Sequence, residues 1–248
     1  MTGQVTTAAL AVIGDIHARF DRLDPVLERV RAEAGLDAVL LVGDIGAEPP
    51  LALRVDAAAS LAFRAASVAR VVEHVRGLGL PVLWVPGNHD PEHLPLPGNV
   101  DGGEATVAGL RVTGVGGAGP ARFGFPYEWS EDEVRRRRLP TWDVLISHTP
   151  PLGTCLDRTR HGDSAGSAAI RELAEGGRGL MVSGHIHEAP GCERLGHTVC
   201  VNAGGLGEPY GRTQVVFAVR RSSDAGETWE ISHWEPGRAE DRRWRFTL

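Results

Sequence analysis

The chain has 248 residues, 42% of them hydrophobic and 23% charged, which is typical of a globular protein with a sizeable core. Its formal net charge of −6 argues against a protein that coats nucleic acid, because binding many phosphates requires a basic face. The three cysteines, Cys155, Cys192 and Cys200, contain no Cys-x-x-Cys pair and are too few for a disulfide framework or a structural zinc knuckle.

Apolar runs alternate with helical patterns in the first third of the chain, which predicts βαβ units with parallel strands. The runs are continuous rather than alternating, as expected for strands that are buried on both faces. The expected elements are a strand at 8–13, a helix from Phe20 to Val30 ending near Gly35, a strand at 38–42, a helix from Leu61 to Val75 closed by Gly77 and Gly79, and a strand at 82–85.

The pattern then changes to short strands and loops. Residues 106–107 and 110–115 flank Ala108-Gly109 and predict a hairpin, and the glycine-rich stretch 114–124 predicts a surface loop. A short helix is expected at 130–139, with acids in its first turn and arginines 135–138 as its solvated end. Later strands are expected at 144–146, 180–182, 198–201 and 214–218, with an edge strand at 229–232.

No repeat, low-complexity tract or linker divides the chain, so residues 1–248 are expected to form one domain. The apolar stretch at 8–13 is too short to span a membrane, and we expect a cytoplasmic protein without membrane contact. Cys192 and Cys200 could face each other across a hairpin, but two buried free thiols are the preferred interpretation.

Metal-ligating side chains follow five of the predicted strands. The segments are Gly-Asp-Ile-His at 14–17, Gly-Asp at 43–44, Gly-Asn-His-Asp at 87–90, Ser-His at 147–148 and Gly-His-Ile-His at 184–187. The carboxyl ends of strands in α/β sheets are where ligands bind. Residues two apart in extended backbone point to the same side, so Asp-x-His and His-x-His can each reach one ion cluster. The preceding glycines allow a sharp turn and a close approach of backbone to the site.

These motifs, in this order, resemble the calcineurin-like metallophosphoesterase superfamily from about Ala8 to Asn202. The resemblance implies an α/β fold with four αββα layers, two packed mixed β-sheets and a metal site at the carboxyl ends of the strands. It implies a first metal on Asp15, His17, Asp44 and His187, with Asp44 bridging to a second metal on Asn88, His148 and His185. It also implies catalytic roles for His89, which would face the substrate, and for Asp90, which would orient His89.

The resemblance implies two divalent ions as cofactors. Carboxylate, amide and imidazole ligands suit manganese, iron, zinc or similar ions better than a metal that prefers thiolates. Manganese is the expected metal, with iron, zinc, cobalt or nickel as alternatives. Two such ions about 3.5–4 Å apart can share a water and lower its pKa, giving a hydroxide that attacks phosphorus in line. His89 would neutralise charge on the phosphoryl oxygens and protonate the leaving oxygen. The expected partner is a small phosphoester, either a diester or a monoester, and the oligomeric state is left open.

The loop 150–167 follows His148 directly and contains Arg158, Arg160 and His161. Because arginine suits a phosphate group, these three residues are candidates for substrate binding. The alternative is an ordinary polar loop that ends at Ser167 as a helix cap.

Departures from better-known branches narrow the resemblance. The chain has no Asp three residues after Asp44, no Gly-Asp-x-Val-Asp-Arg-Gly, no Arg-Gly-Asn-His-Glu, and no tyrosine after Asp44 until Tyr127. What remains resembles small prokaryotic phosphoesterases and phosphodiesterases. The rival readings are a non-catalytic interaction scaffold on the same fold and a metal-dependent hydrolase of non-phosphate bonds.

Overall fold

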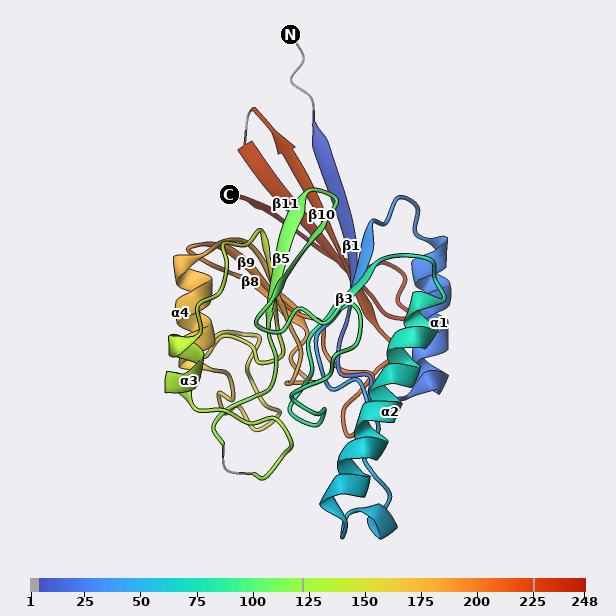
Figure 1. Cartoon of the computed structure of the whole chain (residues 1–248). Helices are drawn as coiled ribbons and strands as arrows, with labels where there is room; N and C mark the ends of the chain where they lie inside the picture. The colour runs from blue at the N-terminus through green and yellow to red at the C-terminus, as the bar shows by residue number, and fades with distance from the viewer. Residues whose placement is uncertain (1–4, 122, 225) are drawn as a thin grey trace.

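The computed structural model describes residues 5–121, 123–224 and 226–248, which form two six-stranded sheets with helices on both outer faces (Figure 1). The first sheet has the order β12-β11-β10-β1-β2-β3 and the second the order β4-β5-β6-β7-β9-β8. Each sheet mixes parallel and antiparallel pairs. The expected four-layer αββα sandwich with two mixed sheets is confirmed.

The first sheet combines three parallel strands from the start of the chain with three antiparallel strands from its end. Two helices and a short 3-10 turn connect the parallel strands. The elements are β1 (Thr6–Ile13), α1 (Phe20–Ala32), β2 (Ala38–Leu41), η1 (Leu51–Leu53), α2 (Ala57–Arg76), β3 (Val82–Trp84), β10 (Val215–Ser223), β11 (Gly226–Trp234) and β12 (Arg242–Thr247).

The second sheet takes up the middle of the chain, and its outer face is covered by two short helices. Its elements are β4 (Glu104–Val107), β5 (Leu110–Val115), α3 (Glu131–Arg136), β6 (Val144–Ser147), α4 (Ala168–Gly176), β7 (Arg178–Ser183), β8 (Gly191–Leu195) and β9 (His197–Asn202). The start of α3 is closed by a capping box between Ser130 and Glu133, which matches the acids expected in the first turn.

The continuous apolar run of β1 contributes to two hydrophobic cores, one on each face of its sheet. Leu10 and Val12 belong to the core between the two sheets, whereas Ala11 and Ile13 belong to the core beneath α1 and α2. Alternate side chains of a strand point to opposite faces, so a strand in the middle of four layers must be apolar at every position. This burial explains why the runs at 8–13 and 38–42 do not alternate.

Two strands were not expected from the sequence, and one was misplaced. In β12 the exposed Arg243 and Arg245 alternate with Trp244 and Phe246, which pack against the core. β8 is an edge strand of mostly partial burial, so its apolar signal is weak. The expectation of an edge strand at 229–232 is wrong, because β11 pairs with β10 on one side and with β12 on the other.

The glycine-rich stretch at 114–124 is a surface loop only in its second half. Gly116, Gly117 and Ala118 are buried, and the added methyl group of an alanine at Gly117 would meet the rings of Tyr127 and Trp129. The glycines therefore let the backbone pass beneath two large aromatic side chains.

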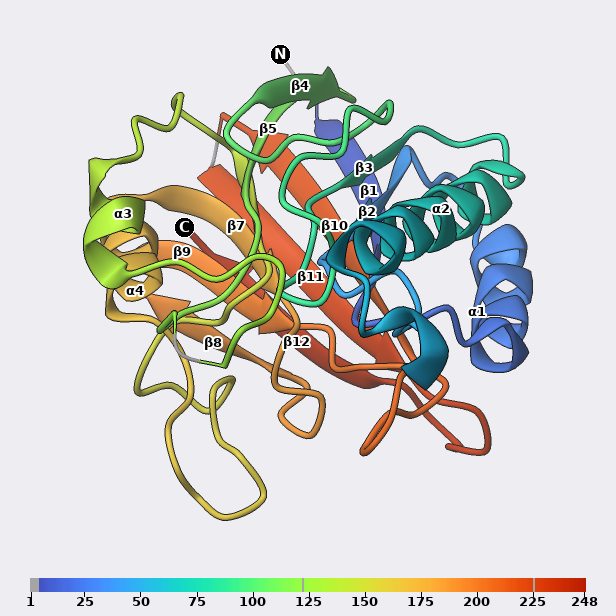
Figure 2. The ribbon, with the colours of Figure 1, turned by 60° about the horizontal axis from the view of Figure 1, so that its bottom comes forward.

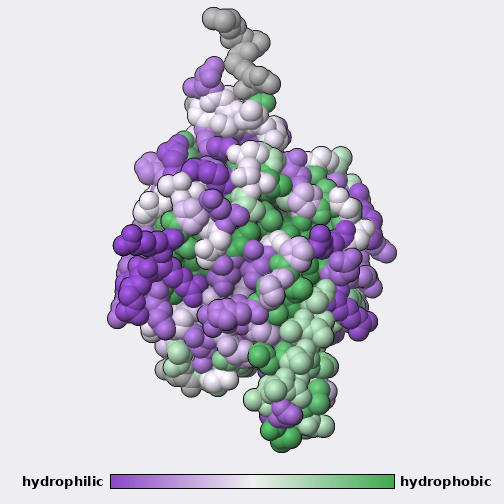
Figure 3. All heavy atoms as spheres, viewed as in Figure 1, coloured by the Kyte–Doolittle hydropathy of each residue, from purple (hydrophilic) through white to green (hydrophobic). Residues whose placement is uncertain are grey.

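All three cysteines are free thiols: Cys155 is exposed, Cys192 half-buried and Cys200 buried. Cys192 pairs with Val201 across the β8–β9 hairpin and Glu193 pairs with Cys200, so the two cysteines are not cross-strand partners. Within the described ranges, none of the helices combines the length and the apolar character needed to cross a membrane. Apolar residues gather over η1 and the start of α2 (Figure 3), where Leu51, Val55 and Leu61 are exposed.

Candidate metal centre

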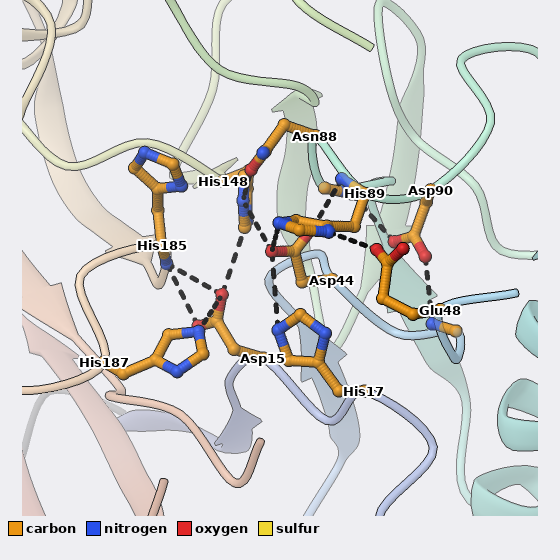
Figure 4. Close-up of polar contacts among 12 residues, drawn as sticks. Asp15, His17, Asp44, Glu48, Asn88, His89, Asp90, His148, His185 and His187 are labelled. Atoms are coloured by element: carbon orange, nitrogen blue, oxygen red, sulfur yellow. Dashed lines mark hydrogen bonds and ion pairs between the residues drawn. The ribbon is translucent and has the colours of Figure 1, made fainter. Parts of the chain in front are cut away.

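Seven candidate metal ligands converge where the two sheets meet (Figure 4). They follow β1, β2 and β3 of the first sheet and β6 and β7 of the second. A backbone-to-side-chain hydrogen bond joins the sheets here, since the His185 N–H donates to both carboxylate oxygens of Asp15 at 2.9 and 3.0 Å. The ligands are Asp15, His17, Asp44, Asn88, His148, His185 and His187.

One group of four is arranged to hold a cation. Single ligand atoms of Asp15, His17, Asp44 and His187 all lie within 4.8 Å of one another. Within the group, His17 Nε2 is 3.6 Å from an Asp44 oxygen and His187 Nε2 is 3.5 Å from an Asp15 oxygen. Buried nitrogens of both histidines, Nε2 of His17 and Nδ1 of His187, have no hydrogen-bond partner among the described residues. Buried polar atoms without partners are rare, and a metal ion would satisfy His17 Nε2.

The other candidates surround His148. Its Nδ1 lies 2.8 Å from the carbonyl oxygen of Val42, so in the neutral ring Nδ1–H donates there and the lone pair lies on Nε2. That Nε2 is 2.9 Å from Asn88 Oδ1 and 3.6 Å from Asp44 Oδ2, and the His185 ring centroid lies 5.0 Å from that of His148. Lone pairs of an imidazole and an amide oxygen therefore converge beside a carboxylate, which a cation would satisfy.

Asp44 lies between the two groups. Its Oδ2 is 3.6 Å from His17 Nε2 and also 3.6 Å from His148 Nε2, while its Oδ1 accepts the His89 N–H at 2.9 Å. Burial opposes ionisation of this carboxyl, but the surrounding imidazoles of His148, His89 and His17 hold its pKa well below the usual range. Burial lowers the pKa of His185 to about 4, with a further contribution from His148, which keeps that ring in the neutral form that binds metals.

The backbone at the site is strained. Asp15, His17, Asp44 and His185 all have positive φ, at 35°, 46°, 47° and 63°. Residues other than glycine rarely adopt this conformation, and such strain clusters at functional sites. The expectation that Asp-x-His and His-x-His converge through extended backbone is therefore wrong for Asp15, His17 and His185, because the chain turns at each of them.

The strand-end glycines have the close approach expected of them. A methyl group at Gly184 would collide with the carboxylate of Asp15, and one at Gly87 would collide with Asp44. Both positions must therefore lack a side chain if the carboxylates are to keep their place.

The structure changes the expectation for Asp90. Its carboxylate is buried and accepts backbone N–H groups from Ile45, Gly46 and Gly87, each at 2.9 Å. Asp90 thus joins the loops that follow β2 and β3, and its hydrogen bonds to the described residues do not include one to the His89 ring. The orienting contact comes from Glu48, whose Oε1 lies within hydrogen-bond distance of His89 Nδ1.

Glu48 is held in place by Arg64 of α2. The guanidinium donates to both carboxylate oxygens, at 2.8 and 2.7 Å, and also to the backbone oxygen of His89. Burial acts to lower the pKa of His89, but the carboxylates of Asp44 and Glu48 outweigh it and raise the pKa above its ordinary value. Sequence analysis missed Glu48 and Arg64; the available signal was an acid four residues after Asp44.

A cavity of about 680 Å³ opens over the metal ligands. Asp44, His89 and their neighbours form its floor, and loop residues from three further segments form its walls. The lining residues are His17, Arg19, Asp44, Glu48, Asn88, His89, Ala118, Gly119, Phe123, Phe125, Glu128, His185, His187, Glu188, Glu208, Pro209 and Tyr210.

The loop after β6 projects from this side of the molecule (Figure 2). Its Arg158, Arg160 and His161 are exposed, and none of the three lines the cavity. Arg158 donates to the Gly162 carbonyl oxygen within the loop, whereas Arg160 donates to the hydroxyl of Tyr210, which does line the cavity. Direct substrate contact by these three residues stays a prediction.

Comparisons with known proteins agree with this geometry. The family model described as calcineurin-like phosphoesterase matches residues 8–189. The uncharacterized protein MJ1162 of Methanocaldococcus jannaschii is 28% identical over an alignment of 141 residues, with 50% of this chain and 63% of that relative covered. The match thus spans less than two thirds of the relative's length.

Two solved structures show the same fold. One crystal structure has a TM-score of 0.68 and 21% identity, with 88% of this chain and 99% of the other covered. A structure described as a novel phosphatase from Mycoplasma pneumoniae has a TM-score of 0.50 and 11% identity, with coverage of 98% and 95%. The family model extends over most of the chain and includes every segment that supplies a candidate ligand, and the chain therefore belongs to the calcineurin-like phosphoesterase family.

Proposed function

We propose that the protein is a dinuclear metal-dependent phosphoesterase that hydrolyses a phosphodiester or a small phosphomonoester. The observation that carries the proposal is the convergence of Asp44 with six further residues that offer oxygen or nitrogen ligands, beneath an open cavity. Asp15, His17, Asp44 and His187 would hold one metal, and Asp44, Asn88, His148 and His185 the other. When bound, divalent metals supply Lewis-acid polarisation of a phosphoryl oxygen and an activated water.

The chain's own contribution to the chemistry centres on His89. Its Nδ1 is directed to Glu48, and its Nε2 lies 4.0 Å from Asp44 Oδ2 at the cavity floor. With Nδ1 engaged, Nε2–H is the group available to a phosphoryl oxygen or to the leaving oxygen. His89 would therefore neutralise growing charge and deliver the proton that the leaving group needs.

A small phosphoester is the partner that the cavity suits best. Its volume of about 680 Å³ is within the range usual for small-molecule sites. We also propose that residues 1–248 act as one domain, because ligands from both sheets must meet to complete the site.

The test is hydrolysis of bis-p-nitrophenyl phosphate and p-nitrophenyl phosphate by protein stripped of metal and reloaded with Mn²⁺. Zinc, iron, cobalt and nickel would be compared in parallel. We expect turnover that depends on metal and falls at least about 100-fold in His89→Ala. His197→Ala is the matched control, because His197 is exposed at the start of β9 and does not line the cavity.

The two substrates separate the alternatives. Faster turnover of the diester would identify a phosphodiesterase, and faster turnover of the monoester a phosphatase. No turnover of either substrate with any of the metals would contradict the enzyme and favour the interaction scaffold.

A further inference from the structure

The outer wall of the cavity is aromatic. Phe123, Phe125 and Tyr210 line it. The Phe125 ring lies between two other rings, with its centroid 4.2 Å from that of His89 and 6.3 Å from that of Phe123. Phe125 is 36% exposed and Phe123 is 63% exposed. A ligand that covered these exposed aromatic side chains would gain from their burial.

The loop that presents these rings is tied to the rest of the site. The carboxylate of Glu128 accepts the N–H groups of Phe123 and Gly124, the latter at 2.9 Å. Tyr127 N–H donates to the backbone oxygen of Asn88 at 3.2 Å. The loop is therefore anchored directly to a segment that carries a candidate metal ligand, which places Phe125 at a defined distance from the reacting group.

Tyr210 is held in place by Arg160. Arg160 donates to its hydroxyl at 3.0 Å and has its guanidinium carbon 5.3 Å from the ring centroid. The backbone N–H of Arg160 donates to the carboxylate of Glu188, another residue that lines the cavity. Arg160 thus supports an aromatic wall, a role other than the phosphate contact expected from the sequence.

The charges of the wall disfavour a second phosphate. Within the part of the chain that the structure describes, Arg19 is the one lysine or arginine that lines the cavity. Its guanidinium already donates to Asp21 and Glu208. Three further carboxylates line the cavity beyond the metal ligands and Glu48, namely Glu128, Glu188 and Glu208. Among the described lining residues, a polyphosphate chain would therefore meet these acids, while the one cation is already paired.

We propose, building on the phosphoesterase function above, that the substrate carries one phosphoryl group and a flat aromatic substituent that stacks on Phe125. The phosphoryl group would bind at the metal ligands, and the aromatic group would lie along Phe125 towards Phe123 and Tyr210. Aryl esters and nucleoside phosphates share this chemistry.

The test measures binding of phosphonates, which the protein cannot hydrolyse, to the Mn²⁺-loaded chain by titration calorimetry. Methylphosphonate and benzylphosphonate present the same anion, so the ratio of their dissociation constants isolates the aromatic group. We expect benzylphosphonate to bind at least about tenfold more tightly. A nucleoside 5′-phosphonate in a third arm separates the two sources, since tighter binding than benzylphosphonate would identify a nucleotide and weaker binding an aryl ester.

Variants test whether the aromatic side chains of the cavity cause the difference between the two dissociation constants. Phe125→Ala and Tyr210→Ala should each reduce the ratio by at least about threefold, and Phe125→Leu should restore part of it because leucine is apolar but not flat. A variant that merely disturbs His89 would weaken both ligands equally and leave the ratio unchanged. Leu51→Ala, which removes an exposed apolar side chain outside the cavity, should behave as the wild type.

The outcomes separate the two proposals. Equal dissociation constants for the two phosphonates, in a preparation that hydrolyses bis-p-nitrophenyl phosphate, would overturn the aromatic specificity alone. A preparation that neither hydrolyses that ester nor binds either phosphonate would overturn the phosphoesterase function on which the specificity rests.

Discussion

At the scale of single residues, the contact between Glu48 and His89 shows how a carboxylate can orient an imidazole ring. Glu48 accepts from His89 Nδ1 on one side and from the Arg64 guanidinium on the other. A fixed acceptor at Nδ1 keeps Nε2 directed into the cavity. Glu48 also lines the cavity, and we infer that it acts through its contact with His89, as a positioning residue.

Replacing Glu48 tests this role. Glu48→Gln keeps the side-chain volume but removes the charge, so we expect kcat to fall about 10- to 100-fold with little change in KM. Metal content, measured by mass spectrometry, should stay at the wild-type level. The control is Glu73→Gln, an exposed glutamate of α2. A rise in KM at constant kcat would instead place Glu48 in substrate binding.

The sequence predicts the ligand positions well but not the residues that support them. Asp15, Asp44 and His148 could be located because each follows an apolar strand, and parallel strands end together. Glu48 could not, since its contact with His89 depends on how the loop after β2 folds. The role predicted for Asp90 was wrong for the same reason: its partners are backbone N–H groups, which leave no mark in the sequence.

At the scale of elements, the β4–β5 hairpin turns on two residues with positive φ, Ala108 at 49° and Gly109 at 76°. Positive φ at both central residues is typical of a type I′ turn, in which Asn-Gly is strongly preferred and a Cβ at the first position is strained. We expect Ala108→Asn to raise the free energy of unfolding by about 0.5–1 kcal/mol. Urea denaturation would measure it, and Gly109→Ala should lower the same quantity. Equal midpoints for Ala108→Asn and the wild type would contradict the assignment of strain to Ala108.

Elements were predictable where burial left a continuous signal. β1 and β2 are buried on both faces, so their apolar runs are unbroken. β12 alternates between half-buried and exposed residues and is rich in arginine, so its sequence resembles that of a polar tail. Only its pairing with β11 in the folded chain identifies it as a strand. Edge strands depend on tertiary pairing more than on their own residues.

His233 of β11 couples the final strands to pH. Its Nε2 donates to Gln214 Oε1 at 2.8 Å, and its Nδ1 accepts from Arg242 of β12, so the folded chain requires the neutral ring. Burial is the largest cause that lowers the pKa of His233 to about 4. The charges of Arg242, Arg238 and Arg212 contribute to this shift, and Glu235 opposes it. The unfolded state, with a pKa near 6.5, binds more protons between these values.

The stability contributed by neutral His233 is therefore complete above about pH 6.5 and is lost as the pH falls towards 4. The shift corresponds to at most about 3 kcal/mol. His233→Gln keeps a donor and an acceptor but does not titrate in this range. Between pH 6.5 and 4, the unfolding free energy of this variant should therefore fall less than that of the wild type, by up to about 3 kcal/mol. Urea titrations at pH 7, 6, 5 and 4 would measure it, with the exposed His197→Gln as control. A slope identical in His233→Gln and the wild type would rule out the neutral, buried ring as its source.

At the scale of the whole molecule, the candidate metal centre joins the two sheets. Asp15 and Asp44 belong to loops of the first sheet, while His148, His185 and His187 belong to loops of the second. The family and the four-layer fold could be inferred from the order of motifs, but this joining role needed the structure, because it rests on contacts such as His148 to the Val42 carbonyl oxygen. Ligands that converge from two layers make metal binding a source of global stability.

Metal removal should therefore lower the melting temperature of the whole chain. At a free metal concentration about 100 times the dissociation constant, binding adds about 2.7 kcal/mol, which for a chain of this size corresponds to about 5–10 °C. Differential scanning calorimetry with Mn²⁺ and with a chelator would measure the difference in a single transition. His187→Ala removes a ligand and should lose most of the metal-dependent shift, whereas His197→Ala should retain it. Because this measurement needs no substrate, a melting temperature unaffected by every divalent metal would argue against the metal centre itself, whatever ester the protein hydrolyses.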